Sequence, residues 1–231
     1  PHIDMTIEML AEHGVTVHRS GSPEHPTWHV EPGPIAAVDR IIEPDLSNAA
    51  PFLVAGLITG GRIRIPDWPE HTTQAGDRLR DLLAQMGAHI ERDPGGLTLS
   101  GPDEVRGLVA DLHDVGELAP VIAAAAALAT TPSHLTGIGH LRGHETDRLA
   151  ALAEMIAELG GEVEFGDDDL RITPRPLHGG TVSSYGDHRM ATAAAVLGLR
   201  TPDVWIRDIA TTRKTLLDFP GMWIDMLEQR A

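Results

Sequence analysis

The sequence contains no cysteine and few basic side chains. Without a thiol the chain forms no disulfide, binds no metal through thiolate and uses no cysteine nucleophile, which is consistent with a cytoplasmic location. The 18 Lys and Arg residues are outnumbered by 34 Asp and Glu residues, which leaves a formal net charge of -16. Because such a charge repels the phosphates of nucleic acids, we expect no nucleic-acid partner.

Long apolar runs are also lacking. The longest run, 118–129, is much shorter than the roughly 20 residues that span a bilayer, and no cleavable signal segment opens the chain, so we expect no membrane association. The 231 residues are 42% hydrophobic, which suffices for a large core. Since the sequence opens at Pro1 inside an expected helix, we expect it to be part of a longer protein.

An internal repeat organises the chain. Gly14, Gly87 and Gly160 lie 73 residues apart, and each follows an amphipathic run and precedes two β-prone stretches, which predicts a helix followed by a hairpin. Between these segments lie alanine-rich runs that predict buried helices, each followed by a strand. The helix-and-hairpin segments are 4–17, 77–90 and 147–165, the alanine-rich segments are 47–65, 116–137 and 187–208, and a last helix is expected at 219–229.

These elements predict a β-α-β-α-β-β module in about three copies, the first and the last of them incomplete. Arrangement of the copies around an axis, with sheets outside and alanine-rich helices inside, buries the apolar surfaces of both. A solenoid is the alternative. The contrast between buried and amphipathic helices favours the closed α/β domain.

The heads of the alanine-rich helices carry polar residues: Asn48, Glu117 and the triplet Asp187, His188 and Arg189. A helix N-terminus carries about half a positive charge and free N–H groups, so heads that meet form an anion site. There Arg189 can bind a carboxylate or phosphate, and His188 can donate to an oxyanion or move a proton. The alternative is that Asp187 only caps its helix and Arg189 pairs with a surface acid.

A second candidate is Glu145, three residues before Arg148 in the expected first turn of a helix. A carboxylate near both a core and a cation can act as a general acid or base, although an ordinary ion pair is the alternative. Residues 77–79 repeat residues 147–149, which suggests an architectural role for Arg148. The position equivalent to Glu145 in the preceding copy is Ala75, so this acid is particular to one copy.

Two further patterns are weaker. The polar stretch 210–220 contains Arg213 and Lys214, which alone predict no more than a solvated loop. His140 and His144 lie near a carboxylate, but no HExxH pattern and no cysteine accompany them, so we expect no metal.

Five motifs occur in order over nearly the whole chain: EPDLSNAAPFL at 43–53, DVGELAP at 114–120, LRGHETDRL at 141–149, GDHRMA at 186–191 and TRKTLLDFP at 212–220. Together they resemble the 5-enolpyruvylshikimate-3-phosphate synthase family. The resemblance implies two domains, each an inside-out α/β barrel of three β-α-β-α-β-β units with mixed sheets outside. It implies that residues 1–42 end the last unit of the N-terminal domain and that residues 43–231 form the C-terminal enolpyruvyl transferase domain.

The resemblance also implies a reaction: transfer of the enolpyruvyl group of phosphoenolpyruvate to the 5-hydroxyl of shikimate 3-phosphate, with release of phosphate and without a cofactor. By the same resemblance Glu117 takes the hydroxyl proton and binds shikimate 3-phosphate, and Glu145 handles the proton at the methylene carbon. The residues implied to hold phosphoenolpyruvate are Arg148, Arg189 and Lys214, with His188 beside its reacting end.

In two places the sequence departs from the family pattern. His144 stands where many members have a lysine that binds the shikimate phosphate, and His2 stands where some have a tyrosine. Neutral histidine is a weaker anion ligand than lysine. The family site lies between two domains, so we expect this chain alone to be inactive without the missing N-terminal domain, and the complete enzyme to be a monomer.

Two other functions remain open from the sequence. The sister family of UDP-N-acetylglucosamine enolpyruvyl transferases shares the fold, although the HETDR and GDHRMA strings favour the shikimate enzyme. A non-catalytic binding module of the same fold is expected to lose the charged residues. The joint presence of Glu117, Glu145, Arg189 and Lys214 argues against such a non-catalytic module.

Overall fold

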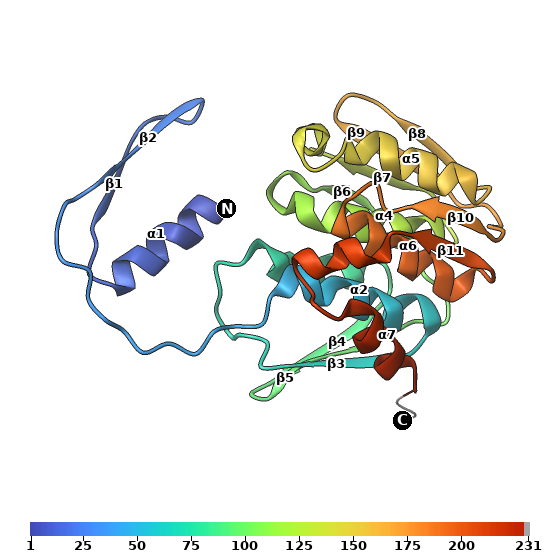
Figure 1. Cartoon of the computed structure of the whole chain (residues 1–231), viewed down its shortest axis with the longest axis horizontal. Helices are drawn as coiled ribbons and strands as arrows, with labels where there is room; N and C mark the ends of the chain where they lie inside the picture. Colours follow the sequence, from blue (N-terminus) through green and yellow to red (C-terminus); the bar gives the residue numbers. More distant parts are fainter. Residues whose placement is uncertain (229–231) are drawn as a thin grey trace.

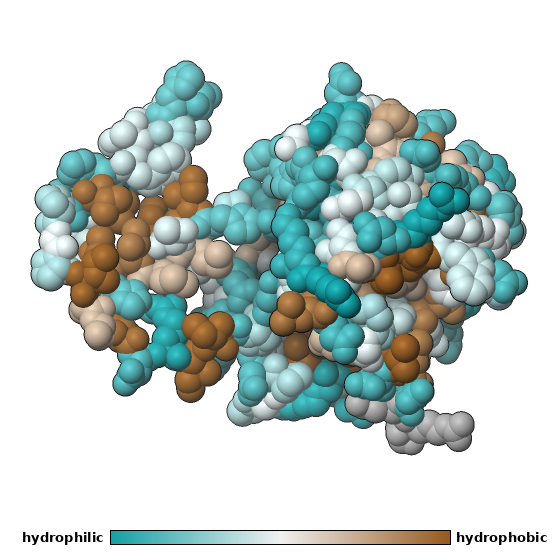
Figure 2. Space-filling view, in the orientation of Figure 1, coloured by the Kyte–Doolittle hydropathy of each residue, from teal (hydrophilic) through white to brown (hydrophobic). Residues whose placement is uncertain are grey.

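The computed structural model describes residues 1–228, which form a small N-terminal arm and a large body (Figure 1). The arm consists of α1 (His2–Glu12) and the antiparallel hairpin of β1 (Val17–Ser22) and β2 (His25–Val30). This confirms the helix followed by a hairpin that the sequence predicts for the first segment. α1 buries none of its side chains, and hydrophobic surface is visible on the arm in Figure 2.

Residues 31–45 lead from the arm to the body without regular secondary structure. The arm contacts the body through polar pairs: His2 Nε2 lies 3.0 Å from Glu117 Oε1, and Thr73 Oγ1 donates to the Glu8 carboxylate. Residues of both parts line a cleft of about 630 Å³. The expected domain boundary falls within this connecting stretch and stays a prediction.

Three alanine-rich helices form the centre of the body (Figure 1). They are α2 (Leu46–Thr59), α4 (Ala119–Ala127) and α6 (His188–Arg200), and each packs against the other two. Every residue of α4 is buried, as are most residues of α2 and α6. The predicted burial is therefore confirmed, and the small side chains explain it because they let the helix axes approach closely.

Three sheets surround this helical centre. One is antiparallel with the order β3-β5-β4, one has the order β6-β7-β9-β8, and the third pairs β10 with β11 in parallel. β6 and β7 are also parallel, as expected for strands joined by a crossover helix. The strands are β3 (Arg62–Pro66), β4 (His89–Asp93), β5 (Gly96–Ser100), β6 (Val109–Asp111), β7 (Ser133–Thr136), β8 (Glu162–Phe165), β9 (Asp169–Thr173), β10 (Gly180–Ser183) and β11 (Val204–Arg207).

The remaining helices are shorter or amphipathic. α5 buries the predicted apolar stripe, including Leu149, Leu152 and Ile156. None of the helices in residues 1–228 combines the length and the apolarity that crossing a bilayer requires. Residue 229, the expected end of the last helix, lies outside the described residues. These helices are η1 (Ala75–Arg78), α3 (Leu79–Gln85), η2 (His113–Leu118), η3 (Gly139–Gly143), α5 (Arg148–Glu158), η4 (Ile209–Lys214) and α7 (Phe219–Glu228).

The run β6-α4-β7-α5-β8-β9 is one complete β-α-β-α-β-β module. Gly14, Gly87 and Gly160, which follow the helices before the three hairpins, have φ angles of 78°, 110° and 87°. This left-handed region favours glycine and ends a helix. The repeat and the inside-out α/β arrangement predicted from it are therefore confirmed.

Candidate active site

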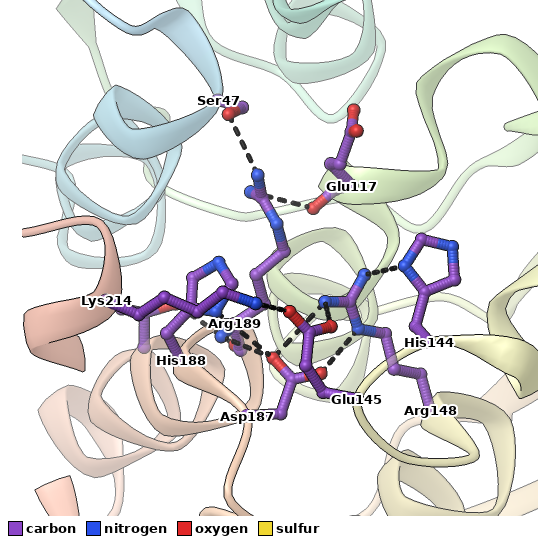
Figure 3. A network of polar contacts seen from close by, with 10 residues as sticks. Ser47, Glu117, His144, Glu145, Arg148, Asp187, His188, Arg189 and Lys214 are labelled. Carbon is purple, nitrogen blue, oxygen red and sulfur yellow. Dashed lines mark hydrogen bonds and ion pairs between the residues drawn. The ribbon is translucent and has the colours of Figure 1, made fainter. Parts of the chain in front are cut away.

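The N-terminal ends of the three alanine-rich helices meet at the Arg189 side chain (Figure 3). Arg189 lies in the first turn of α6. Its Nη2 donates to Ser47 Oγ at the start of α2, at 3.0 Å, and its Nη1 donates to the backbone carbonyl of Glu117 just before α4, at 3.3 Å. The predicted meeting of the helix heads is confirmed. Helix N-termini present partial positive charge and N–H groups, so this point favours an anion.

The residue at the head of α2 that reaches Arg189 is Ser47, and not Asn48 as the sequence indicated. Asp45 caps the helix by accepting from the backbone N–H groups of Ser47 and Asn48, each at 3.0 Å. The Asn48 side chain donates to the same carboxylate at 2.8 Å, so Asn48 stabilises the cap while Ser47 reaches Arg189. Sequence reasoning missed Ser47. The signal for it is an acidic N-cap residue followed by a small hydroxyl residue in the first turn.

Arg189 is half-buried, yet within residues 1–228 it forms no ion pair with a carboxylate. Burial lowers the pKa of its guanidinium, which nevertheless stays charged because arginine loses its proton only far above neutral pH. The alternative that Arg189 pairs with a surface acid is therefore wrong. A partly buried positive charge that contacts only a hydroxyl and a carbonyl is suited to bind a carboxylate or a phosphate.

Asp187 holds the heads of α6 and α5 together. It is 0% exposed, accepts from the Arg189 backbone N–H at 2.8 Å as the cap of α6, and accepts from Arg148 Nε at 2.7 Å. Arg148 Nη2 lies 3.3 Å from the second oxygen of the same carboxylate. The capping role given to Asp187 as an alternative from the sequence is confirmed.

Arg148 differs from its counterpart in the repeat, Arg78. Arg78 is exposed, whereas Arg148 is 1% exposed and lies against Asp187. The repeat therefore does not account for Arg148, whose burial is particular to this copy. Because Asp187 occupies Nε and part of Nη2, a ligand can be bound only by the remaining N–H groups of Arg148.

Glu145 lies in the bend before α5 and not in its first turn, because the helix begins at Arg148 with Asp147 as its N-cap. The sequence interpretation was wrong on this point. The expected contact still exists, since Arg148 Nη2 donates to Glu145 Oε2 at 2.9 Å. Glu145 also forms an ion pair with Lys214, the last residue of η4. Lys214 thereby joins the site, whereas Arg213 is exposed and lies outside this network.

The ammonium of Lys214, assisted by the charge of Arg148, lowers the pKa of the Glu145 carboxyl to about 2, although partial burial acts in the opposite direction. At neutral pH Glu145 is therefore ionised. In this arrangement it can accept a proton but has none to donate.

We expect the stability that Glu145 contributes to disappear in acid. A carboxyl with a lowered pKa in the folded state stabilises the fold above its ordinary pKa of 4.5, and this contribution is lost as the pH falls towards about 2. Urea unfolding over this pH range should show a smaller loss of stability for Glu145→Gln than for the wild type. The exposed Glu164→Gln serves as the control with the same charge change. Equal slopes for all three proteins would contradict the pairing.

Two histidines of the site are held in the neutral form. Burial, followed by the charge of Arg189, lowers the pKa of His188, whose buried Nδ1 has no hydrogen-bond partner within residues 1–228. Burial, followed by the charge of Arg148, lowers the pKa of His144, whose Nδ1 lies 3.4 Å from Arg148 Nη1. A neutral imidazole donates a single N–H and carries no charge. Each is therefore equipped to donate one hydrogen bond to a ligand.

Glu117 lies near the guanidinium end of the Arg189 side chain, and Glu145 lies nearer its backbone end (Figure 3). Glu117 contacts His2 of the arm, and both Glu117 and Arg189 line the cleft between arm and body. A carboxylate that borders a cleft can accept a proton from a ligand hydroxyl. Two acids at different positions along one cationic side chain suit proton transfers at two different atoms of a bound ligand.

The histidines near the site are not arranged as a metal centre. The rings of His140 and His144 meet edge to face with centroids 6.1 Å apart. Across residues 1–228, no group of three or more His, Asp or Glu side chains is placed to hold a metal ion.

The structure thus gathers the predicted site residues in one region around Arg189, and their catalytic and binding roles stay predictions. His2 reaches this region from the arm. The residues brought together are Glu117, His144, Glu145, Arg148, Asp187, His188, Arg189 and Lys214.

The sequence is similar to enolpyruvyl transferases along nearly its whole length. The family model described as EPSP synthase (3-phosphoshikimate 1-carboxyvinyltransferase) matches residues 1–223. A 3-phosphoshikimate 1-carboxyvinyltransferase of Kocuria rhizophila is 52% identical over 227 residues, which are 98% of this chain and 50% of the relative. The chain therefore spans about half the length of the curated relative that it matches.

Solved structures share the fold. The EPSP synthase of Acinetobacter baumannii has a TM-score of 0.79 at 24% identity, over 94% of this chain and 53% of that one. The enolpyruvyl transferase NikO of Streptomyces tendae has a TM-score of 0.74 at 19% identity, over 98% of this chain and 53% of that one. These likenesses are evidence for the fold alone, and they agree with the predicted class.

Proposed function

Because the chain belongs to the EPSP synthase family, we propose that the complete protein transfers the enolpyruvyl group of phosphoenolpyruvate to the 5-hydroxyl of shikimate 3-phosphate, a step of aromatic amino-acid biosynthesis. The observation that carries the proposal is the half-buried Arg189, which has no carboxylate partner in residues 1–228 and lies where three helix heads meet. Such a cation is suited to an anionic ligand placed between two acids.

Two polyanionic substrates require a concentration of positive charge, although the chain as a whole carries a charge of -16. Arg189, Lys214 and the N–H groups of Arg148 that Asp187 does not occupy supply it for phosphoenolpyruvate, together with the helix N-termini. Local charges a few ångströms away outweigh distant surface carboxylates, which solvent and salt screen. His188, neutral and beside Arg189, is placed to donate a hydrogen bond at the reacting end.

Glu117 and Glu145 are each proposed to carry out a different proton transfer. Glu117 accepts the proton of the 5-hydroxyl as its oxygen bonds to the central carbon of phosphoenolpyruvate, and a proton is added at the methylene carbon, which gives a tetrahedral intermediate. Loss of a proton from that carbon and departure of phosphate then complete the transfer. Glu145 is the group proposed to handle the proton at the methylene carbon. Because it is ionised in the ligand-free site, it must first take up that proton from solvent. Every one of these steps uses protein groups only, and no cofactor is invoked.

We assign to His144 part of the contact with the phosphate group of shikimate 3-phosphate. Since this histidine is neutral near pH 7 and replaces a lysine of other members, most of the binding energy for that phosphate must come from elsewhere. We propose that it comes from an N-terminal domain outside these 231 residues, because the chain spans about half of its relative. The monomeric state of the complete enzyme and its cytoplasmic location also stay predictions.

The 231-residue chain alone is expected to bind shikimate 3-phosphate weakly, because it supplies only one side of the proposed site. Isothermal titration should give no saturation in the micromolar range, whereas the complete protein saturates. Tight binding to the chain alone would show that the second domain is not needed for the phosphate contact.

The proposed function is tested by measuring phosphate release by the complete protein from phosphoenolpyruvate with each of two acceptors. Shikimate 3-phosphate should support turnover and UDP-N-acetylglucosamine should not. Turnover only with the nucleotide sugar would assign the protein to the sister activity. Absence of turnover with both acceptors, in a folded protein, would support a non-catalytic module.

A further inference from the structure

Four charged side chains of the site form a row of alternating sign. Asp187 pairs with Arg148, Arg148 pairs with Glu145, and Glu145 pairs with Lys214. Two negative and two positive charges cancel, so the row is neutral as it stands. Figure 3 shows the carboxylate of Glu145 between the Lys214 ammonium and the Arg148 guanidinium.

The two ends of this row differ in burial. Asp187 and Arg148 are buried and joined by two hydrogen bonds, so Arg148 remains neutralised when Glu145 is absent. Glu145 is 26% exposed and lies in a bend outside α5, and Lys214 is 55% exposed at the end of η4. Glu145 can therefore leave Lys214 without breaking a helix or stranding a buried charge.

We infer that Glu145 acts as an internal substitute for an anionic ligand, and that a ligand anion must displace it from Lys214 in order to bind. Arg189, which has no carboxylate to displace within residues 1–228, is the first contact. Lys214 and the Nη2 N–H of Arg148 that now pairs with Glu145 become available as Glu145 withdraws. The inference rests on the proposed function only for the identity of the natural anion.

Displacement of Glu145 from Lys214 also changes the pKa of the Glu145 carboxyl. While Lys214 holds Glu145, the pKa of this carboxyl is about 2, so it carries no proton. Once the ligand neutralises Lys214, the pKa of Glu145 rises towards its ordinary range and a proton can be taken up. The other charged or titratable groups that face Glu145 are Arg148 from α5, His144 from its own segment, and His188 from α6. Arrival of the anion would thus produce the proton carrier that the proposed chemistry needs.

Sulfate binding to the complete protein tests the displacement, since sulfate does not titrate between pH 5 and 8 and needs no second substrate. Removing the competing carboxylate with Glu145→Gln should tighten sulfate binding by about two- to fivefold, the size expected for a partly exposed ion pair. Glu164→Gln makes the same charge change on the exposed face of β8 and should leave the affinity unchanged. In a Lys214→Met background the advantage of Glu145→Gln should largely disappear.

Proton uptake provides a second readout that does not depend on affinity. Titration of sulfate at pH 5 in buffers of different ionisation enthalpy should show more proton uptake by the wild type than by Glu145→Gln. Equal uptake, or equal or weaker sulfate binding by Glu145→Gln, would overturn the inference. These outcomes leave the proposed activity untouched, because that activity is judged separately by phosphate release with the two acceptors.

Discussion

Replacing Asp187 with alanine is expected to destabilise the protein by about 3–5 kcal/mol, the cost of leaving a buried arginine without its partner. Asp187 is 0% exposed and carries both hydrogen bonds that neutralise Arg148 from within the core. The lost helix cap adds about 1 kcal/mol. Urea unfolding at neutral pH measures the change as a shift in midpoint at constant slope.

Two further variants separate these contributions. Asp187→Asn keeps an oxygen that can cap α6 but removes the charge that pairs with Arg148, so it should lose most of the stability that Asp187→Ala loses. The double variant Asp187→Ala with Arg148→Met removes both charges and should recover part of the loss. A cost for Asp187→Ala below about 1 kcal/mol would mean that only the cap matters.

Arg189→Ala in the complete enzyme should raise the half-saturating concentration of phosphoenolpyruvate at least tenfold, because a charge-assisted contact contributes about 1.5–3 kcal/mol, or roughly 10- to 150-fold in affinity. Arg189 is well suited to make such a contact, since its present partners are the Ser47 hydroxyl and a backbone carbonyl. Steady-state kinetics with varied phosphoenolpyruvate and saturating acceptor measures the change.

The matched control for Arg189 is Arg62→Ala at the start of β3, an exposed arginine that follows the C-terminal end of α2, the end opposite to the one that reaches Arg189. This variant should leave the half-saturation unchanged. Arg189→Lys keeps the charge but loses the planar fork, so its half-saturation should lie between those of the wild type and Arg189→Ala. An unchanged value for Arg189→Ala would remove Arg189 from the binding site.

The architecture was predictable because its signals are local. Glycines at fixed intervals end helices through their left-handed φ, and alanine-rich runs identify buried helices without reference to any partner. The meeting of the helix heads followed from the repeat itself. Capping by Asp187 was equally local, since it depends only on the residues that follow it.

The long-range pairings were not predictable from pattern. Arg148 and Arg78 occupy equivalent places in the repeat, and only packing against α6 makes one of them buried. Lys214 is separated from Glu145 by 69 residues, and no spacing rule relates them. Ser47 meets Arg189 across 142 residues for the same reason. Such contacts are set by the tertiary arrangement of helices that each look ordinary alone.

The carboxylate of Asp187 contributes both to the stability of the fold and to the geometry of the site. It secures the fold by neutralising Arg148, and it sets the direction in which α6 presents Arg189. The stability of the fold and the placement of the proposed ligand-binding arginine therefore depend on one side chain. Glu145 and Lys214, at the more exposed end of the row, lie outside this double constraint, because neither is fully buried.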